Sequence, residues 1–178
     1  MAEFLANVQS QIGDPFTQPV EAHQFDVDAK GKVTKVNMTV ELSISRPRYG
    51  GGRGSDKDKA IIQKAVELIK DHENQHAAIA KQMFAAAVCA ALGKKEADAE
   101  KAIDNIVCKT MAKAQEDYDM QHGQIVVIKD STGAPSDVTT GPVATRPDYG
   151  CAKAKAAPAA APGAAPAKPA PGATQPGQ

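Results

Sequence analysis

One stretch, residues 57–92, decides the fold: KDKAIIQKAVELIKDHENQHAAIAKQMFAAAVCAAL. Apolar or small side chains recur in it every three or four residues, as the buried stripe of an α-helix requires. The residues of this stripe are Ile62, Ala65, Ile69, Ile79, Ala80, Met83, Ala87 and Ala90. Ser55 or Asp56 is a suitable N-cap and Gly93 a suitable stop, so the sequence predicts one long helix over 57–92.

A second helix is predicted over about residues 97–121. Its stripe consists of Ala99, Ile103, Val107, Met111, Ala114 and Tyr118. Gly123 ends it, and the short link between the helices predicts an antiparallel hairpin. If the chain folds back near residue 98, His122 lies level with His76, and Cys89 lies level with Cys108.

Two further segments have the pattern of β-strands. Residues 23–46 predict a hairpin with a turn at Gly31, because apolar and polar side chains alternate over 36–45 and Pro47 ends the run. Residues 125–128 predict one more short strand, whereas residues 137–151 predict irregular structure. The fold class is therefore α+β, with an antiparallel β-hairpin or small sheet packed on a long two-helix hairpin.

The composition limits the remaining choices. The chain has 178 residues with 21 basic and 21 acidic side chains, which argues against a strongly electrostatic nucleic-acid binder. Its longest apolar stretch, 84–92, is about half of a membrane span. Residues 1–151 predict one domain, and the Ala/Pro/Lys-rich residues 152–178 predict a disordered tail. Within the ambiguous first 19 residues, 2–12 can form a short helix that Gly13-Asp14-Pro15 would end.

The three cysteines are too few for a disulfide scaffold. Cys89, Cys108 and Cys151 also lack the close spacing of a cysteine zinc site. They are interpreted first as buried, inert thiols, and a Cys89–Cys108 disulfide is the alternative.

The chemistry centres on His72-Glu73-Asn74-Gln75-His76 within the first helix. Histidines four residues apart project from one helix face and can bind a single zinc ion. Glu73 can then take a proton from water whose pKa the metal has lowered to about 7. Two inward histidines beside a glutamate are costly to bury without a partner, and a metal removes that cost.

A catalytic zinc needs a third protein ligand. The continuation typical of metzincins is excluded, because Ile79 and Gln82 occupy the positions where it requires Gly and His. His122 is the predicted third ligand from the hairpin register, and Glu116 is the alternative.

Other polar residues have weaker signals. Asp119 shares the face of His122 and is a candidate to orient its ring, although solvation of a helix end explains it equally well. His23 is interpreted as a surface histidine. Tyr118, Tyr149 and Arg146 are candidates to stabilise a developing oxyanion, with no basis for choosing among them.

The chain resembles the bacterial predicted secreted zinc-dependent proteases over roughly residues 33–123. The matching parts are the strand 33–45 with Pro47, the motif His72–His76, and Asp117 followed by His122-Gly123. Glu116 and Met120 stand where that family has Tyr and Thr. The resemblance implies a zincin-like fold, peptidase activity and a secreted or periplasmic location, although the N-terminus shows no secretory signal.

The sequence thus predicts a zinc metallopeptidase with a peptide or protein substrate. In this interpretation Glu73 is the general base, and His72, His76 and His122 hold Zn²⁺. Two alternatives stay open: a non-catalytic zinc-binding or helical-hairpin interaction module, and a secreted effector or toxin peptidase.

Overall fold

The computed structural model describes residues 16–44, 54–147 and 149. The elements in chain order are β1 (Phe16–Val27), β2 (Val33–Ile44), α2 (Asp56–Ala91), α3 (Glu96–Asp104), the π-helix η1 (Asn105–Met111), α4 (Ala112–His122), β3 (Gln124–Lys129) and β4 (Pro135–Gly141). The short helix predicted over 2–12 and the predicted tail both lie outside these residues. The domain boundary at residue 151 therefore stays a prediction.

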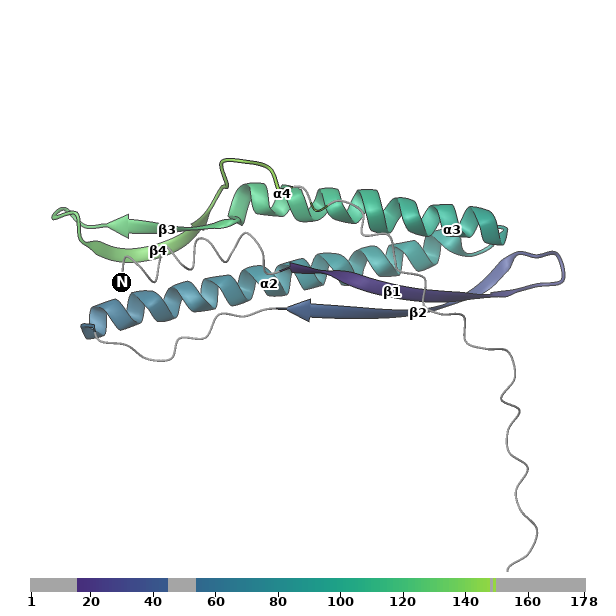
Figure 1. Cartoon of the computed structure of the whole chain (residues 1–178), viewed down its shortest axis with the longest axis horizontal. Helices are drawn as coiled ribbons and strands as arrows, with labels where there is room; N and C mark the ends of the chain where they lie inside the picture. The colour runs from purple at the N-terminus through teal and green to yellow at the C-terminus, as the bar shows by residue number, and fades with distance from the viewer. Residues whose placement is uncertain (1–15, 45–53, 148, 150–178) are drawn as a thin grey trace, which may run out of the picture.

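The elements lie roughly parallel to one long axis, and α2 is at the centre (Figure 1). The α3–η1–α4 helix runs back along α2, while the β1–β2 hairpin lies along the C-terminal half of α2. The β3–β4 hairpin contacts the N-terminal half of α2. The predicted α+β class, with a β-hairpin packed on a two-helix hairpin, is confirmed, and a second hairpin is added to it.

Helix α2 begins and ends where its sequence predicts. Ser55 is the N-cap and forms a capping box with Asp58, whose backbone N–H donates to the Ser55 hydroxyl. The box satisfies two amide groups that no residue within the helix can pair. Gly93, with φ of 74°, takes the left-handed conformation that follows the last turn.

The first hairpin also follows its sequence pattern. Along β2, Val33, Val36, Met38, Val40 and Leu42 are buried or half-buried, and the residues between them are exposed. Gly31, with φ of 71°, makes the predicted turn. Strand β1 begins at residue 16, seven residues earlier than predicted, and pairs with β2 over that length.

The second helix contains a π-helix that the sequence analysis missed. The buried residues Ala99, Ile103, Met111, Gln115 and Asp119 fall at intervals of four or eight along it. An α-helix drifts by about 40° over each interval of four. The wider turns of η1 absorb that drift, because each π-turn holds an extra residue. The inward face after η1 therefore carries Gln115 and Asp119 instead of the predicted Ala114 and Tyr118.

The register of the helix pair differs from the prediction as well. The chain turns within residues 92–95, not near residue 98. Backbone hydrogen bonds join this turn to Val33 of β2. As a result His76 faces Gln115 and not His122.

The core consists of separate apolar clusters along α2. One cluster, at its N-terminal end, contains Ile61, Ala65, Ile69, Ile125 and Val138. A second, at its C-terminal end, contains Val33, Ala87, Ala91, Ala99 and Ile103, and a third beside it contains Ala80, Phe84 and Met111. Between these clusters, α2 buries the polar residues His72, Glu73 and His76.

Strand β4 replaces the irregular structure predicted over residues 137–141, whereas residues 142–147 are irregular as predicted. It pairs antiparallel with β3, which confirms the strand predicted over 125–128. Val138 is its one fully buried apolar side chain, so the strand has little hydrophobic pattern to recognise. Lys64 of α2 pairs with Asp137 at 2.7 Å and ties this hairpin to the helix.

The cysteines differ from both expectations. Cys89 is free and exposed, so it is neither a buried thiol nor bridged to Cys108. Cys108 is disulfide-bonded, and Cys151 lies outside the described residues.

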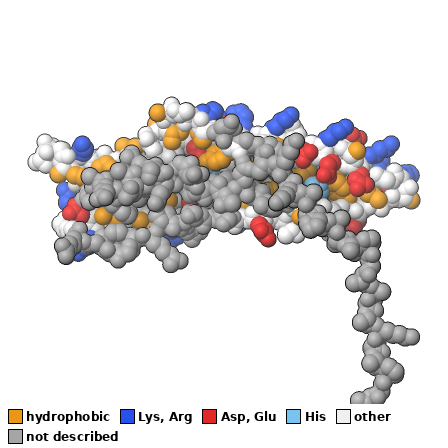
Figure 2. All heavy atoms as spheres, viewed as in Figure 1, with side chains coloured by type: hydrophobic (Ala, Val, Ile, Leu, Met, Phe, Trp, Pro, Cys, Tyr) orange, Lys and Arg blue, Asp and Glu red, His pale blue; other side chains and the backbone are white. Residues whose placement is uncertain are grey.

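The described part of the surface carries charges of both signs. Basic and acidic side chains both line the edge formed by the second helix (Figure 2). Within the described residues, no helix combines the length and the hydropathy needed to cross a bilayer.

Candidate metal centre

The centre of α2 presents three buried polar side chains. His72, Glu73 and His76 are 3%, 1% and 1% exposed. His72 and His76 lie one helical turn apart, and their Nε2 atoms are 2.9 Å from each other. The helical spacing predicted from the sequence therefore brings both imidazoles to one point.

Asp119 of α4 completes a group of three. Its Oδ1 lies 3.0 Å from Nε2 of His72 and 2.8 Å from Nε2 of His76. Among the described residues, these three form the one group of histidine, cysteine or acidic side chains with the spacing to hold a metal ion. All three are buried, so water does not screen their charges and lone pairs.

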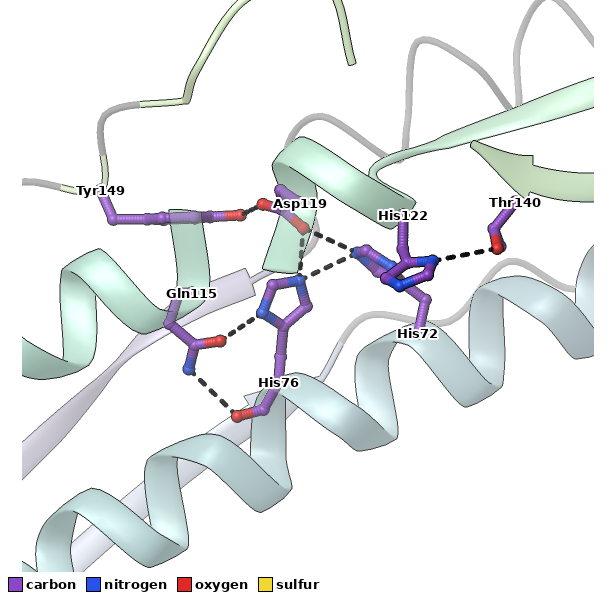
Figure 3. A network of polar contacts seen from close by, with 7 residues as sticks. All are labelled: His72, His76, Gln115, Asp119, His122, Thr140 and Tyr149. Atoms are coloured by element: carbon purple, nitrogen blue, oxygen red, sulfur yellow. Dashed lines mark hydrogen bonds and ion pairs between the residues drawn. The ribbon is translucent and has the colours of Figure 1, made fainter. Parts of the chain in front are cut away.

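Gln115 determines which nitrogen of His76 faces the group (Figure 3). Its Oε1 accepts a hydrogen bond from Nδ1 of His76, and its Nε2 donates to the His76 carbonyl at 3.0 Å. Because an amide oxygen only accepts, this network assigns the proton to Nδ1. In the neutral ring, Nε2 then directs a lone pair at His72 and Asp119. Gln115 could not be found from the sequence, because its inward position depends on the π-helix.

The three facing atoms have too few protons to share. When His76 is neutral, its Nε2 and Oδ1 of Asp119 both accept, so Nε2 of His72 is the one facing atom that can carry a proton between them. On the other side of that ring, Nδ1 of His72 is buried without a hydrogen-bond partner among the described residues. An acceptor cluster of this kind is costly to bury unless a cation occupies it. The donor set of two imidazoles and a carboxylate suits a divalent metal such as zinc.

In the metal-free state, a proton on His76 supplies part of the positive charge that a metal ion would bring. Burial lowers the pKa of His76, but hydrogen bonds with Asp119 and Gln115, together with the negative charges of Asp119 and Glu73, outweigh it. The pKa of His76 therefore lies above its ordinary value. The site thus favours a positive charge between these residues, whichever ion supplies it.

Tyr149 orients the other oxygen of Asp119. Its hydroxyl donates a hydrogen bond to Oδ2, which leaves Oδ1 directed at the two histidines. Burial favours the neutral carboxyl, but hydrogen bonds from His72, His76 and Tyr149 hold the pKa of Asp119 well below its usual range. Burial and the bond to Asp119 raise the pKa of Tyr149, so the phenol keeps its proton.

Glu73 lies close enough to influence the whole site. Its charge contributes to the raised pKa values of His76, Tyr118 and Tyr149. The predicted general base is therefore in the same buried region as the group that can hold a metal.

Other predicted residues are placed at the margin of this group. His122 lies one turn beyond Asp119 with its Nδ1 3.5 Å from the Thr140 hydroxyl, and its ring is 5.0 Å from that of Tyr118. The Tyr118 ring in turn is 5.0 Å from the His72 ring.

Glu116, the alternative third ligand, instead pairs with Arg146 at 3.2 Å. His23, predicted as a surface histidine, lies on β1 with a side chain only 13% exposed and pairs with Glu100 of α3 at 2.7 Å.

Residues 17–125 match the model of a family described as bacterial proteins of unknown function, DUF922. The chain belongs to this family. The match covers more than half of the sequence and includes β1 from its second residue, β2, the helical hairpin and the whole His72/His76/Asp119 group. The family description names no activity. No curated protein and no solved structure matches the chain significantly.

Proposed function

We propose that this DUF922 protein is a zinc-dependent metallopeptidase. The observation that carries the proposal is the meeting of three buried metal-ligating atoms within 3.0 Å of one another, with Glu73 in the same region. Two imidazoles and one carboxylate make up a known type of catalytic zinc site, in which a position stays open for water or substrate.

The distances between the ligand atoms suit one small ion. Zinc binds imidazole nitrogen and carboxylate oxygen at about 2.0–2.2 Å. Because the three atoms lie 2.8–3.0 Å from one another, a single zinc ion can lie about 2.0–2.2 Å from all of them. When bound, zinc supplies Lewis acidity, which acidifies water and polarises a peptide carbonyl.

Other residues of the chain transfer the proton and orient the metal ligands. Glu73 accepts the proton of the attacking water and delivers it to the leaving amine, as a general base and then a general acid. Gln115 holds His76 with Nε2 inward, and Tyr149 holds Asp119 with Oδ1 inward. Partners of this kind fix the orientation of ligands that would otherwise rotate.

The third ligand in this proposal is Asp119, and His122 is the competing prediction from the sequence. Asp119 Oδ1 already lies within 3.0 Å of both histidines, which supports it as a ligand. His122 contacts Tyr118 and Thr140 on the neighbouring side. Replacing each by Ala separates the two: Asp119→Ala should abolish tight zinc binding, whereas His122→Ala should weaken it by no more than about 10–100-fold.

The burial of the group supports a second candidate function, a non-catalytic metal site that stabilises the helical hairpin. His72, His76 and Asp119 are at most 6% exposed, as is typical of closed structural sites. In that case the metal would contribute folding free energy and no turnover.

Glu73→Gln distinguishes the two functions. The variant keeps the size of the side chain and removes its basicity. A peptidase should keep its zinc and lose hydrolysis of an unstructured protein such as casein by at least about 100-fold. Glu67→Gln, on an exposed turn of the same helix, is the matched control. Equal hydrolysis by the wild type and Glu73→Gln, with zinc bound to both, would exclude the peptidase and leave the structural site.

A further inference from the structure

The segment after β4 lies against α4 beside the candidate metal centre. We name its described residues, 142–147 and 149, the strap. The strap has no regular secondary structure. At its start Val143 packs so closely on Gly123 that a Cβ there would lie 2.6 Å from both Val143 Cγ1 and the Asp119 carbonyl oxygen. A side chain at position 123 would therefore push the strap away from α4.

Arg146 fastens the middle of the strap to α4. Its guanidinium lies 2.8 Å from Oδ1 of Asp117 and 3.2 Å from Oε2 of Glu116. Arg146 is half-exposed, so this attachment is screened by solvent and is weaker than a buried pair. Asp117 also pairs with Lys113 of its own helix at 2.6 Å, and that contact does not involve the strap.

Tyr149 brings the strap to the metal centre itself. Its hydroxyl donates to Asp119, and its ring centroid is 6.1 Å from that of His76. In Figure 3 the strap reaches Asp119 from the side opposite α2. The ring thus forms part of the cover that leaves His76 1% and Asp119 6% exposed.

We propose that the strap is a gate over the His72/His76/Asp119 group, with Arg146 as its latch. This inference rests on the proposed function in one respect: a peptide must reach the centre, and His72, His76 and Asp119 are buried while the strap is in place. Moving α2 or α4 would break helical hydrogen bonds and core packing. Releasing the strap breaks side-chain contacts such as those of Val143, Arg146 and Tyr149 and leaves both helices in place.

The test compares the rates of zinc exchange with the equilibrium affinity for zinc. Arg146→Ala should speed both zinc uptake and removal of zinc by an added chelator by about two- to fivefold, as loss of an exposed ion pair allows. Its Kd for zinc should stay unchanged, because Arg146 does not touch the group. Arg146→Lys, which keeps the charge, should restore most of the wild-type rates. Lys113→Ala, which removes the other partner of Asp117, is the matched control and should exchange zinc at the wild-type rate.

A second measurement needs no metal. In zinc-free protein, the rates at which diethyl pyrocarbonate modifies His72 and His76 can be followed by mass spectrometry, with distant His23 as the internal reference. Arg146→Ala should raise these rates by a similar factor. If wild-type protein binds no zinc, the proposed function fails and this measurement alone decides on the gate. Equal rates for Arg146→Ala and Lys113→Ala would overturn it, as would faster zinc release with unchanged uptake.

Discussion

Helix α2 and the second helix contact each other through apolar side chains at one end of their interface and through polar side chains at the other. Near the connecting turn, Ala87 and Ala91 pack on Ala99 and Ile103, and all four are fully buried. At the other end, His72 and His76 face Gln115 and Asp119. The apolar end is stabilised by burial alone. The polar end buries lone pairs and a carboxylate, and it needs a cation to offset their desolvation. One helix pair thus contains an apolar region that stabilises the fold and a polar region that can hold a metal ion.

The largest expected effect comes from removing a histidine at the polar end. His72→Ala or His76→Ala should abolish tight zinc binding, because each removes a ligand from a group of three. Gln75→Ala, exposed on the same turn of α2, is the control and should keep its zinc. The measurement is zinc titration against a competing chromophoric chelator. Wild-type affinity in both histidine variants would place the metal elsewhere.

At the apolar end, a truncation should reduce stability without affecting the metal. Ile103 is 0% exposed within its cluster, so Ile103→Ala should lower the free energy of unfolding by about 2–5 kcal/mol. Exposed Lys101→Ala is the control. Urea denaturation of the zinc-bound protein measures the change. Zinc affinity of the folded variant should stay within about twofold, and a large loss would show that the two ends are coupled.

Gln115→Ala tests the support of a ligand. It removes the acceptor of the His76 Nδ1 proton and the donor to the His76 carbonyl. Zinc affinity should fall by about 10–100-fold, as is typical when a partner of a metal ligand is lost. Exposed Gln121→Ala is the control. An unchanged affinity would mean that packing alone orients His76.

The smallest effect is expected at the turn of the second hairpin, distant from both ends. Hydrogen bonds from Thr132 and Ala134, together with Lys57, lower the pKa of Asp130 to about 2. Its unfolded pKa is about 3.9, so its contribution to stability is fully present above about pH 4 and is lost as the pH falls toward 2. Asp130→Asn should remove this part of the acid dependence of stability. Identical pH profiles for the variant and the wild type would show that the turn does not depend on this charge.

The regular elements could be predicted from the sequence because their signals are local. The period of α2, its cap at Ser55, its stop at Gly93 and the alternation along β2 all follow from neighbouring residues. The pair His72 and His76 could be found for the same reason, since one helix sets their spacing. Strand β4 could not, because it buries little more than Val138 and carries mainly small polar residues.

The partner of the two histidines was harder to predict because it depends on two distant features. The chain turns within residues 92–95, which moves the second helix along α2. The extra residue in the π-helix η1 then shifts the inward face of α4 by one position, from Ala114 and Tyr118 to Gln115 and Asp119. No residue in η1 has a pattern that distinguishes it from an α-helix. The assignment of His122 as the third ligand, based on the sequence register, therefore stays a prediction that the Asp119 and His122 variants will decide.

The most direct test of the account is the metal content of the wild-type protein, purified without chelators and analysed by inductively coupled plasma mass spectrometry. The buried His72/His76/Asp119 group predicts about one zinc per chain, lost in Asp119→Ala and retained in exposed Gln121→Ala. Wild-type protein without a transition metal that also takes up none on titration with zinc would contradict the account.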